Sequence, residues 1–332
     1  MNKKTSCGMF RLNVNVIHRH IPGMILSRCW VFTLVLIAFS GCDLFPQRNE
    51  EANGQLVSKL ISELELLESR GLFKKDAVNF AIINRYGTSY GGSRALEGFN
   101  TDGSSISLDE MVERCINSTG TTEETSVIPC LRESYIAAEQ PRFSHAGILY
   151  KIPGQDWSVR QSLRSTKTGK HFQWFGSLEQ FVDIPLIERR IEVLIPTHEI
   201  QSRMSRAILI EGAGSDLIDP DYNLVAKPFQ TEEQMSNQFV LEIMASVLQP
   251  LGQPISRENA QAYLAEKNYR PSIILLGGVR SFAKWDNLIP TMNLKDQPLV
   301  RKYEIGEFIS VMSVRKFLES EGVVAGKIEA SL

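Results

Sequence analysis

A histidine and a serine lie in segments whose patterns suit acyl chemistry. His145 lies near the start of a stretch, residues 142–150, that alternates small or polar with apolar residues and predicts a β-strand. Ser236 falls near the start of a predicted helix, because Thr231 and Gln234 have capping-box spacing and apolar residues then recur every four positions. A hydroxyl placed there faces the partly positive end of a helix, which favours an oxyanion. The pair therefore suits a nucleophile and an imidazole base.

The same two segments resemble motifs of known protein families. Residues 144–148 (Ser-His-Ala-Gly-Ile) and 235–240 (Met-Ser-Asn-Gln-Phe-Val) are similar to the histidine strand and the nucleophile helix of circularly permuted papain-like (NlpC/P60-type) hydrolases and acyltransferases. That family normally has cysteine where this chain has Ser236. Over most of the mature chain the sequence also resembles the bacterial family called domain of unknown function 2145, through residues 143–148, 157–159, 222–228, 236–242 and 269–272.

The papain-like resemblance implies a role for one further residue. In the permuted families a polar residue on the strand after the histidine orients the imidazole, and Gln161 or Arg160 occupies that region here. Gln161 can fix the tautomer of His145 by a hydrogen bond, but it brings no charge to stabilise an imidazolium. Backbone N–H groups at the start of the Ser236 helix are the expected oxyanion hole.

Three residues beside Ser236 are further candidates for ligand contact. Tyr222 and Asn223 lie in a turn that leads into the Ser236 helix, and Asn237 follows Ser236 directly. We expect these side chains to line the same cleft. The alternative is that Asn223 caps the turn while Tyr222 packs against its neighbours.

Two functions follow from these residues, besides a purely structural role in which Ser236 packs and His145 is a buried, satisfied imidazole. The first is binding of a cell-envelope peptide or lipid ligand in a papain-like cleft, without turnover. The alternative is a serine-variant amidase, esterase or acyltransferase that uses Ser236 and His145, which needs a well-oriented base because a hydroxyl is harder to deprotonate than a thiol. The distance between the side chains of Ser236 and His145 discriminates between these functions, because a distance short enough for a hydrogen bond favours catalysis.

The N-terminus resembles a bacterial lipoprotein signal. Residues 29–40 are apolar but too short to span a bilayer, and Arg28 precedes them. Small residues then lead into Cys42, the expected lipidated residue, so residues 1–41 are the predicted signal peptide. The alternative is an uncleaved anchor, and Met24 is an alternative start of translation.

The lipid would attach the protein to the cell envelope, facing the periplasm. Residues 42–54 are predicted to form a polar tether, and Asp43 favours the inner over the outer membrane if the host follows the enteric rule. Two cysteines, Cys115 and Cys130, remain after the predicted processing. In an exported protein they most economically form a disulfide, which we place in an insertion around residues 87–140; the alternative is a reactive thiol.

Charge and histidine positions argue against two classes of partner. The formal net charge is −2, and the first 41 residues hold basic but no acidic side chains, so the remainder lacks a basic footprint for nucleic acid. His171 and His198 stand apart from any His/Asp/Glu cluster of recognisable spacing. We therefore interpret both as surface or interface histidines and expect no metal and no other cofactor.

The apolar patterns predict a single α+β domain over residues 55–332. Its expected helices cover residues 55–70, 108–117, 199–211 and 256–268, and its expected strands cover 77–85, 142–150, 157–163, 192–195 and 272–276. Residues 299–305 and 308–312 suggest a final antiparallel pair before a short helix capped by Ser313. We predict a central antiparallel sheet flanked by helices, which the resemblance equates with a permuted papain-like core.

Overall fold

The computed structural model describes residues 49–86, 94–98, 100–101, 104–137, 145–165, 170–184, 188–211, 213–219, 221–224, 226–276 and 297–332. The predicted signal peptide, Cys42 and Asp43 lie outside the described residues. Within those residues, no helix combines the length and the apolar character needed to cross a bilayer.

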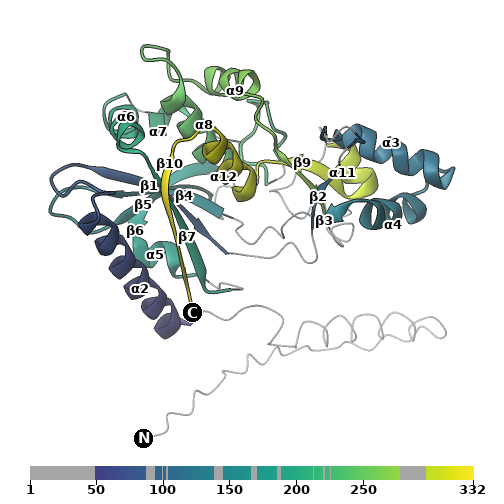
Figure 1. Ribbon diagram of the computed structural model, residues 1–332. Helices are drawn as coiled ribbons and strands as arrows, with labels where there is room; N and C mark the ends of the chain where they lie inside the picture. The colour runs from purple at the N-terminus through teal and green to yellow at the C-terminus, as the bar shows by residue number, and fades with distance from the viewer. Residues whose placement is uncertain are drawn as a thin grey trace, which may run out of the picture. The chain divides into compact units, whose positions relative to one another are not determined.

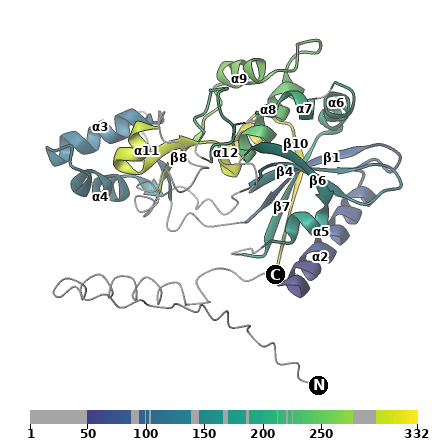
Figure 2. The ribbon, with the colours of Figure 1, turned by 180° about the vertical axis from the view of Figure 1, so that it is seen from behind.

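The chain forms an α+β structure around a six-stranded antiparallel sheet (Figures 1 and 2). The strand order is β10-β7-β1-β4-β5-β6. The strands are β1 (Asn79–Arg85), β4 (His145–Lys151), β5 (Ser158–Arg164), β6 (His171–Ser177), β7 (Arg190–Pro196) and β10 (Val324–Ser331). The predicted large antiparallel sheet flanked by helices is confirmed.

Helices cover both faces of this sheet. On one face lie α2 (Glu50–Ser69) and the short α5 (Leu178–Val182), and α2 buries Leu56, Leu60 and Leu64 there. On the other face lie α6 (His198–Leu209), α7 (Ala213–Asp216), α8 (Ser236–Leu248) and α9 (Arg257–Glu266). Alternate residues of the strands serve the two cores, as strand geometry requires.

The first helix begins earlier than its apolar stripe predicts. Asn49 caps α2 by accepting a hydrogen bond from the Ala52 amide, so the helix starts at Glu50 rather than at Gln55. Residues 50–54, which we assigned to the tether, are therefore helical, and the rest of the predicted tether lies outside the described residues apart from Asn49.

A second, four-stranded sheet combines parts of the insertion with the C-terminal region. Its order is β3-β2-β8-β9, and its strands are β2 (Arg94–Glu97), β3 (Ile136–Ala137), β8 (Ser272–Leu275) and β9 (Ile305–Phe308). The helices α3 (Leu108–Thr119), α4 (Glu124–Ser134) and α11 (Pro298–Tyr303) share an apolar cluster with it.

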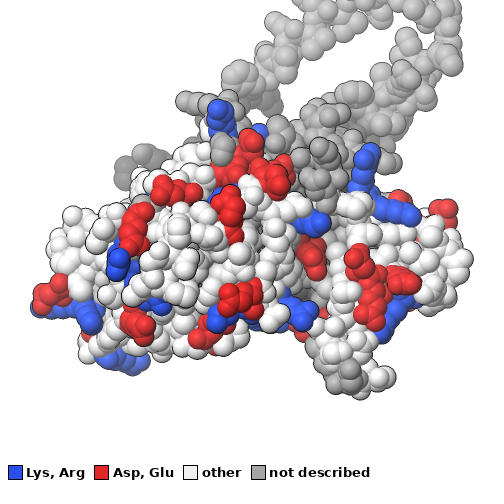
Figure 3. All heavy atoms as spheres, turned by 90° about the horizontal axis from the view of Figure 1, so that it is seen from above, with Lys and Arg blue, Asp and Glu red and all other residues white. Residues whose placement is uncertain are grey.

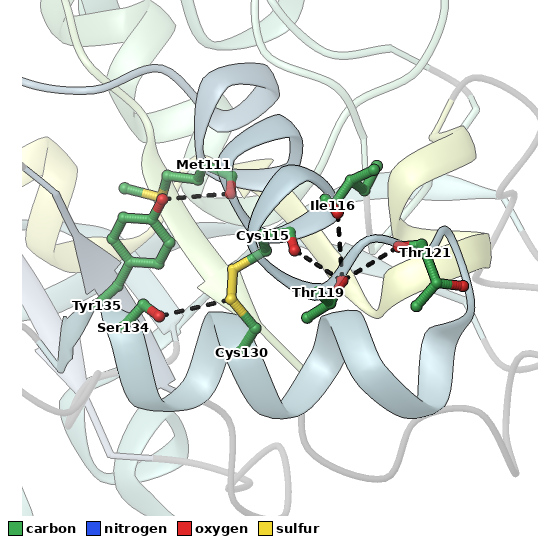
Figure 4. Close-up of a disulfide and its surroundings, with 8 residues drawn as sticks. All are labelled: Met111, Cys115, Ile116, Thr119, Thr121, Cys130, Ser134 and Tyr135. Carbon is green, nitrogen blue, oxygen red and sulfur yellow. Dashed lines mark hydrogen bonds between the residues drawn. A yellow bond between two sulfur atoms is a disulfide. The ribbon is translucent and has the colours of Figure 1, made fainter.

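The predicted disulfide joins two of these helices. Cys115 in α3 and Cys130 in α4 are bonded, with their Cα atoms 5.7 Å apart (Figure 4). The Tyr135 hydroxyl donates to the Met111 carbonyl close by, at 3.2 Å, and this contact ties the chain after α4 back to α3 (Figure 4). The insertion is thus braced covalently and by hydrogen bonding.

The predicted final strand pair is wrong. Residues 298–303 form α11, because Pro298 stands at the first helical position, where its missing N–H costs nothing. β9 pairs with β8 instead, and the chain then turns into α12 (Val311–Ser320). Ser310 caps that helix in a reciprocal box with Ser313, so Ser313 is the third helical residue rather than the cap.

Charged side chains are interspersed on the face of the molecule seen in Figure 3. Lys and Arg lie among Asp and Glu there, so both signs of charge are present across this face (Figure 3).

Candidate functional site

The site forms where one strand and one helix begin. His145 is the first residue of β4, and Ser236 is the first residue of α8. Asn237 holds these two ends together: its Oδ1 accepts from the Ala146 amide at 3.0 Å, and its Nδ2 donates to the Ile309 carbonyl at 3.1 Å. The amide of Asn237 thus fixes the helix start against the strand start and against the entry to α12.

The predicted serine and histidine meet in a hydrogen-bonded relay. The Oγ of Ser236 lies 3.0 Å from Nδ1 of His145, and Nε2 of His145 lies 2.5 Å from Oε1 of Gln161. An amide oxygen only accepts, so Nε2 carries the proton of a neutral ring and Nδ1 presents its lone pair to the Ser236 hydroxyl. This is the tautomer that a base for Ser236 requires.

Arg160, the other candidate orienter, lies elsewhere. Its guanidinium donates to Oε1 of Gln173 and stacks over the Phe175 ring, 4.8 Å from the centroid. Neighbouring side chains of a strand point to opposite faces, so Gln161 reaches His145 and Arg160 does not.

The helix start differs from the expected one. Thr231 and Gln234 do not form a capping box; α8 begins at Ser236, with Met235 as an N-cap that has no side-chain acceptor. The Gln234 side chain is engaged elsewhere, since its Nε2 donates to the Leu217 carbonyl and to Glu242. Because Met235 provides no side-chain cap, the first-turn N–H groups of α8 face the site with the positive end of the helix dipole.

His145 is held neutral. The pKa of His145 is lowered to about 3, mainly by burial and also by the positive charge of Arg85, while the hydrogen bond to Gln161 opposes both. Ser236 is only 5 % exposed, so the relay lies beneath the surface rather than on it.

Tyr222 lies next to the same relay. Its interaction with the Ser236 side chain lowers the pKa of Tyr222, while burial raises that pKa by more. The ring stacks edge-on against His171, with the centroids 5.0 Å apart. Of the three residues predicted to contact a ligand, Tyr222 is the one whose pKa depends on the Ser236 side chain.

Asn223 makes a turn rather than a contact with Ser236. Its Nδ2 donates to the Glu233 carboxylate at 2.5 Å, and its backbone N–H donates to the Gln234 carbonyl at 3.1 Å. These bonds hold the segment that carries Tyr222 against the segment that leads into α8.

The two other histidines that the structure describes differ in their surroundings. His198 is exposed at the start of α6, which Thr197 caps as predicted. His171 was predicted to lie at a surface or interface, and this is wrong: it is buried, with Nε2 bonded to the Ser162 hydroxyl and Nδ1 bonded to the Asp219 carbonyl at 2.8 Å. The Asp219 carbonyl and the Tyr222 ring both contact the imidazole. Burial lowers the pKa of His171 to about 4.

A buried charge network behind the site was not anticipated. Glu242 is fully buried in α8, and its carboxylate accepts from Arg257 at 2.9 Å, from Gln234 at 2.6 Å, from Gln238 at 3.0 Å and from Gln261. Burial raises the pKa of Glu242, and these donors oppose that rise. Every partner donates, so the carboxyl group is the acceptor of all the bonds. The sequence signal was a glutamate inside an otherwise apolar helix.

Arg257 links that network to the loop before Ser236. Its Nη1 donates to the Asp219 carboxylate at 2.5 Å and to the Thr231 carbonyl at 2.6 Å, and its Nη2 donates to the Glu233 carbonyl at 3.0 Å. One guanidinium thereby pins both ends of the loop that carries Tyr222. In the part of the chain that the structure describes, no group of three or more His, Cys, Asp or Glu side chains is placed to hold a metal ion.

The comparisons with known proteins identify the family. Neither the comparison with curated proteins nor the one with solved structures gave a match. The family described as an uncharacterized protein conserved in bacteria, DUF2145, matches residues 132–318, a span that holds His145, Gln161, Tyr222 and Ser236. This match covers more than half of the chain, and the chain therefore belongs to the DUF2145 family.

Proposed function

We propose that this protein is an exported, lipid-anchored envelope protein with a permuted papain-like cleft that cleaves or transfers an acyl group through Ser236. The single observation that supports this is the relay from Ser236 Oγ to His145 Nδ1, at 3.0 Å, and from His145 Nε2 to Gln161 Oε1, at 2.5 Å. A histidine oriented by a third polar group and bonded to a hydroxyl at a helix start is the arrangement of an activated nucleophile.

The proposed reaction uses each of these groups once. Ser236 Oγ attacks the acyl carbonyl carbon as its proton passes to His145 Nδ1, and the first-turn N–H groups of α8 stabilise the oxyanion. The tetrahedral intermediate collapses, the bond to the leaving group breaks, and His145 returns the proton to that group. Water, or another acceptor, then attacks the ester on Ser236 with His145 again as base. An amide, ester or thioester of an envelope peptide or lipid fits this scheme.

Binding without turnover is the second candidate, and three features favour it. Gln161 adds no negative charge beside His145, Ser236 is nearly covered, and burial lowers the pKa of His145 to about 3, which makes it a weak base. In this case His145, Ser236 and Tyr222 would act as polar contacts for the ligand.

Labelling by a fluorophosphonate probe separates the two candidates. The full chain in detergent should be labelled at Ser236, and Ser236→Ala should abolish the labelling while the fold, measured by circular dichroism, is kept. Labelling that is absent while a reference serine hydrolase reacts in the same tube would contradict the hydrolase and leave ligand binding.

Export is proposed on separate grounds. The Cys115–Cys130 disulfide suits an oxidising compartment, and the predicted signal places Cys42 at the processed N-terminus. Cells grown with radiolabelled palmitate should incorporate label into the wild-type protein and not into Cys42→Ser. Equal label in both would rule out lipidation at Cys42.

A further inference from the structure

A buried arginine beside the site has no counter-charge among the residues that the structure describes. Arg85 ends β1 and is 8 % exposed, yet the only hydrogen bond of its guanidinium to the described residues runs from Nη1 to the Phe181 carbonyl. Its Nε is buried with no hydrogen-bond partner. Burial lowers the pKa of Arg85 to about 10, so the group stays charged at neutral pH. Buried charges are normally paired, because desolvation of an isolated ion is costly.

Arg85 lies directly beside the candidate base. It is the cross-strand partner of His145 in the β1–β4 pair, so their side chains leave the same face of the sheet. Both pack against one ring: the Arg85 guanidinium carbon lies 4.5 Å from the Phe181 centroid, and the His145 ring lies 6.1 Å from it. The charge of Arg85 also acts on His145, since it lowers the pKa of that imidazole.

The guanidinium of Arg85 is oriented so that the edge formed by Nε and Nη2 is left for a ligand. Arginine has five N–H donors in a planar fork, and the edge formed by Nε and Nη2 matches the two oxygens of a carboxylate or phosphate. Here the Phe181 carbonyl takes a donor of Nη1, which lies on the other side of the fork. The partly positive start of α8 adds to the same field.

We propose that Arg85 is the anion-binding residue of the Ser236 cleft, and that the acyl substrate or ligand carries a carboxylate or phosphate group that this guanidinium binds. The proposal deepens the proposed function and rests on it for the chemical step, but its binding step stands without turnover. Arg85 lies before the family-matched span of residues 132–318, so this selectivity comes from a part of the chain outside that span.

Such a substrate would also activate its own cleavage. An anion bound to Arg85 offsets the positive charge that lowers the pKa of His145, so His145 becomes a stronger base when the anionic substrate is in place. A neutral substrate leaves the base weak. The relay has two weaknesses, the low pKa of His145 and the lack of charge on Gln161. The negative charge of the bound ligand would then compensate for both.

A structural role for Arg85 is the alternative to exclude. The residue caps the end of α5 through the Phe181 carbonyl, and an arginine can do this without binding any ligand. The chain offers a matched control in Arg203 of α6, whose Nη2 donates to the Gln249 carbonyl at the end of α8 and whose Nε is also buried without a partner. Arg203→Met removes the same kind of contact away from His145.

The first experiment compares esters on the full chain in detergent. The probes are para-nitrophenyl butyrate, the mono-para-nitrophenyl ester of glutarate, and an analogue ending in phosphonate. Wild type should favour one of the anionic esters in kcat/KM by about 10-fold or more, partly through kcat. Arg85→Met should lose this preference, Arg85→Lys should keep part of it, and Arg203→Met should keep all of it. The favoured anionic ester distinguishes a carboxylate from a phosphate ligand.

The second experiment needs no turnover. Succinate or inorganic phosphate should raise the melting temperature of wild type, Ser236→Ala and Arg203→Met, but not that of Arg85→Met. If esters are not cleaved while this stabilisation is seen, the hydrolase fails and the anion site stands. Equal stabilisation of wild type and Arg85→Met, or none in either, overturns the proposal, as does an unchanged ester preference in Arg85→Met.

Discussion

The two ring nitrogens of His145 have different tasks. Nε2 donates to Gln161, and Nδ1 accepts from Ser236. The residue bonded to Nε2 therefore influences both the orientation of the ring and the basicity of Nδ1. Gln161 supplies orientation alone. An acidic residue at position 161 would supply both the orientation of the ring and a negative charge beside it, whereas Gln161 supplies only the orientation.

Replacing Gln161 by glutamate tests this difference. A carboxylate beside Nε2 favours the imidazolium, so Gln161→Glu should raise the pKa of His145 from about 3 by about one to three pH units, and labelling of Ser236 near neutral pH should become faster. The pKa is read from the NMR titration of the ring protons. Gln161→Met is the control: it keeps the volume, loses the acceptor, and should slow labelling. No change in either variant would remove Gln161 from the relay.

Residue patterns predicted part of this site. The histidine and serine came from short motifs, and Gln161 came from its place on the following strand. Arg85 was not predicted as a site residue. It closes the apolar strand Phe-Ala-Ile-Ile-Asn-Arg, and a charged residue is also common at the end of an ordinary strand. Only the pairing of β1 with β4, across residues far apart in the chain, shows that Arg85 faces His145.

Helix α8 is the element on which the site depends. Its first turn presents Ser236 and Asn237, and its second turn carries Glu242 into a network with Arg257 of α9. Arg257 is 6 % exposed and Glu242 is fully buried, so this ion pair is shielded from water on both sides, whereas Asp219, the other partner of Arg257, is 15 % exposed. Removing one partner of such a pair leaves an uncompensated charge in the interior.

A double-mutant cycle across the two helices measures this dependence. Arg257→Met should lower the free energy of unfolding by about 3–5 kcal/mol, because it leaves the Glu242 carboxylate buried without its counter-charge. The double variant Glu242→Met/Arg257→Met should recover a large part of that loss. Urea denaturation gives both values.

The matched control is a pair on the surface. Arg206 bonds to Glu211 at 2.6 Å with side chains 56 % and 38 % exposed, so Arg206→Met should cost less than about 1 kcal/mol. A loss in Arg257→Met as small as in Arg206→Met would show that the buried pair is not required for the fold.

Element prediction succeeded where the signal is local and failed where it is not. The disulfide-bearing helix at Leu108 and the helix after Ser256 were predicted because their caps and apolar spacing lie within one segment. The small sheet was not, since β2 pairs with β8 through residues such as Arg94 and Leu275, and neither strand is longer than four residues. The C-terminal β10 was also missed, because seven of its eight residues are partly or fully exposed at the sheet edge and give a weak apolar pattern.

At the scale of the whole molecule, two neutral histidines link folding to pH. Burial lowers the pKa of His145 to about 3 and that of His171 to about 4, from an unfolded value near 6.5. Between those values the unfolded chain binds more protons than the folded one, so stability falls as pH falls below about 6.5.

The expected slope is measurable. From about pH 6 to about pH 4.5 the two histidines should together lower the free energy of unfolding by up to about 2.7 kcal/mol per pH unit. Urea midpoints taken across this range check it. His145→Gln should remove about half of the slope, and a wild-type stability that stays level over the range would show that these rings are not held neutral.

The place of the insertion has a consequence for how the protein can change. β1 ends at Arg85 and β4 starts at His145, and these adjacent strands would form a simple hairpin if residues 86–144 were a tight turn. The chain therefore leaves the large sheet at Arg85 and returns to it at His145, the candidate base of the site. New insertions can therefore be accommodated there without shifting the register of either strand.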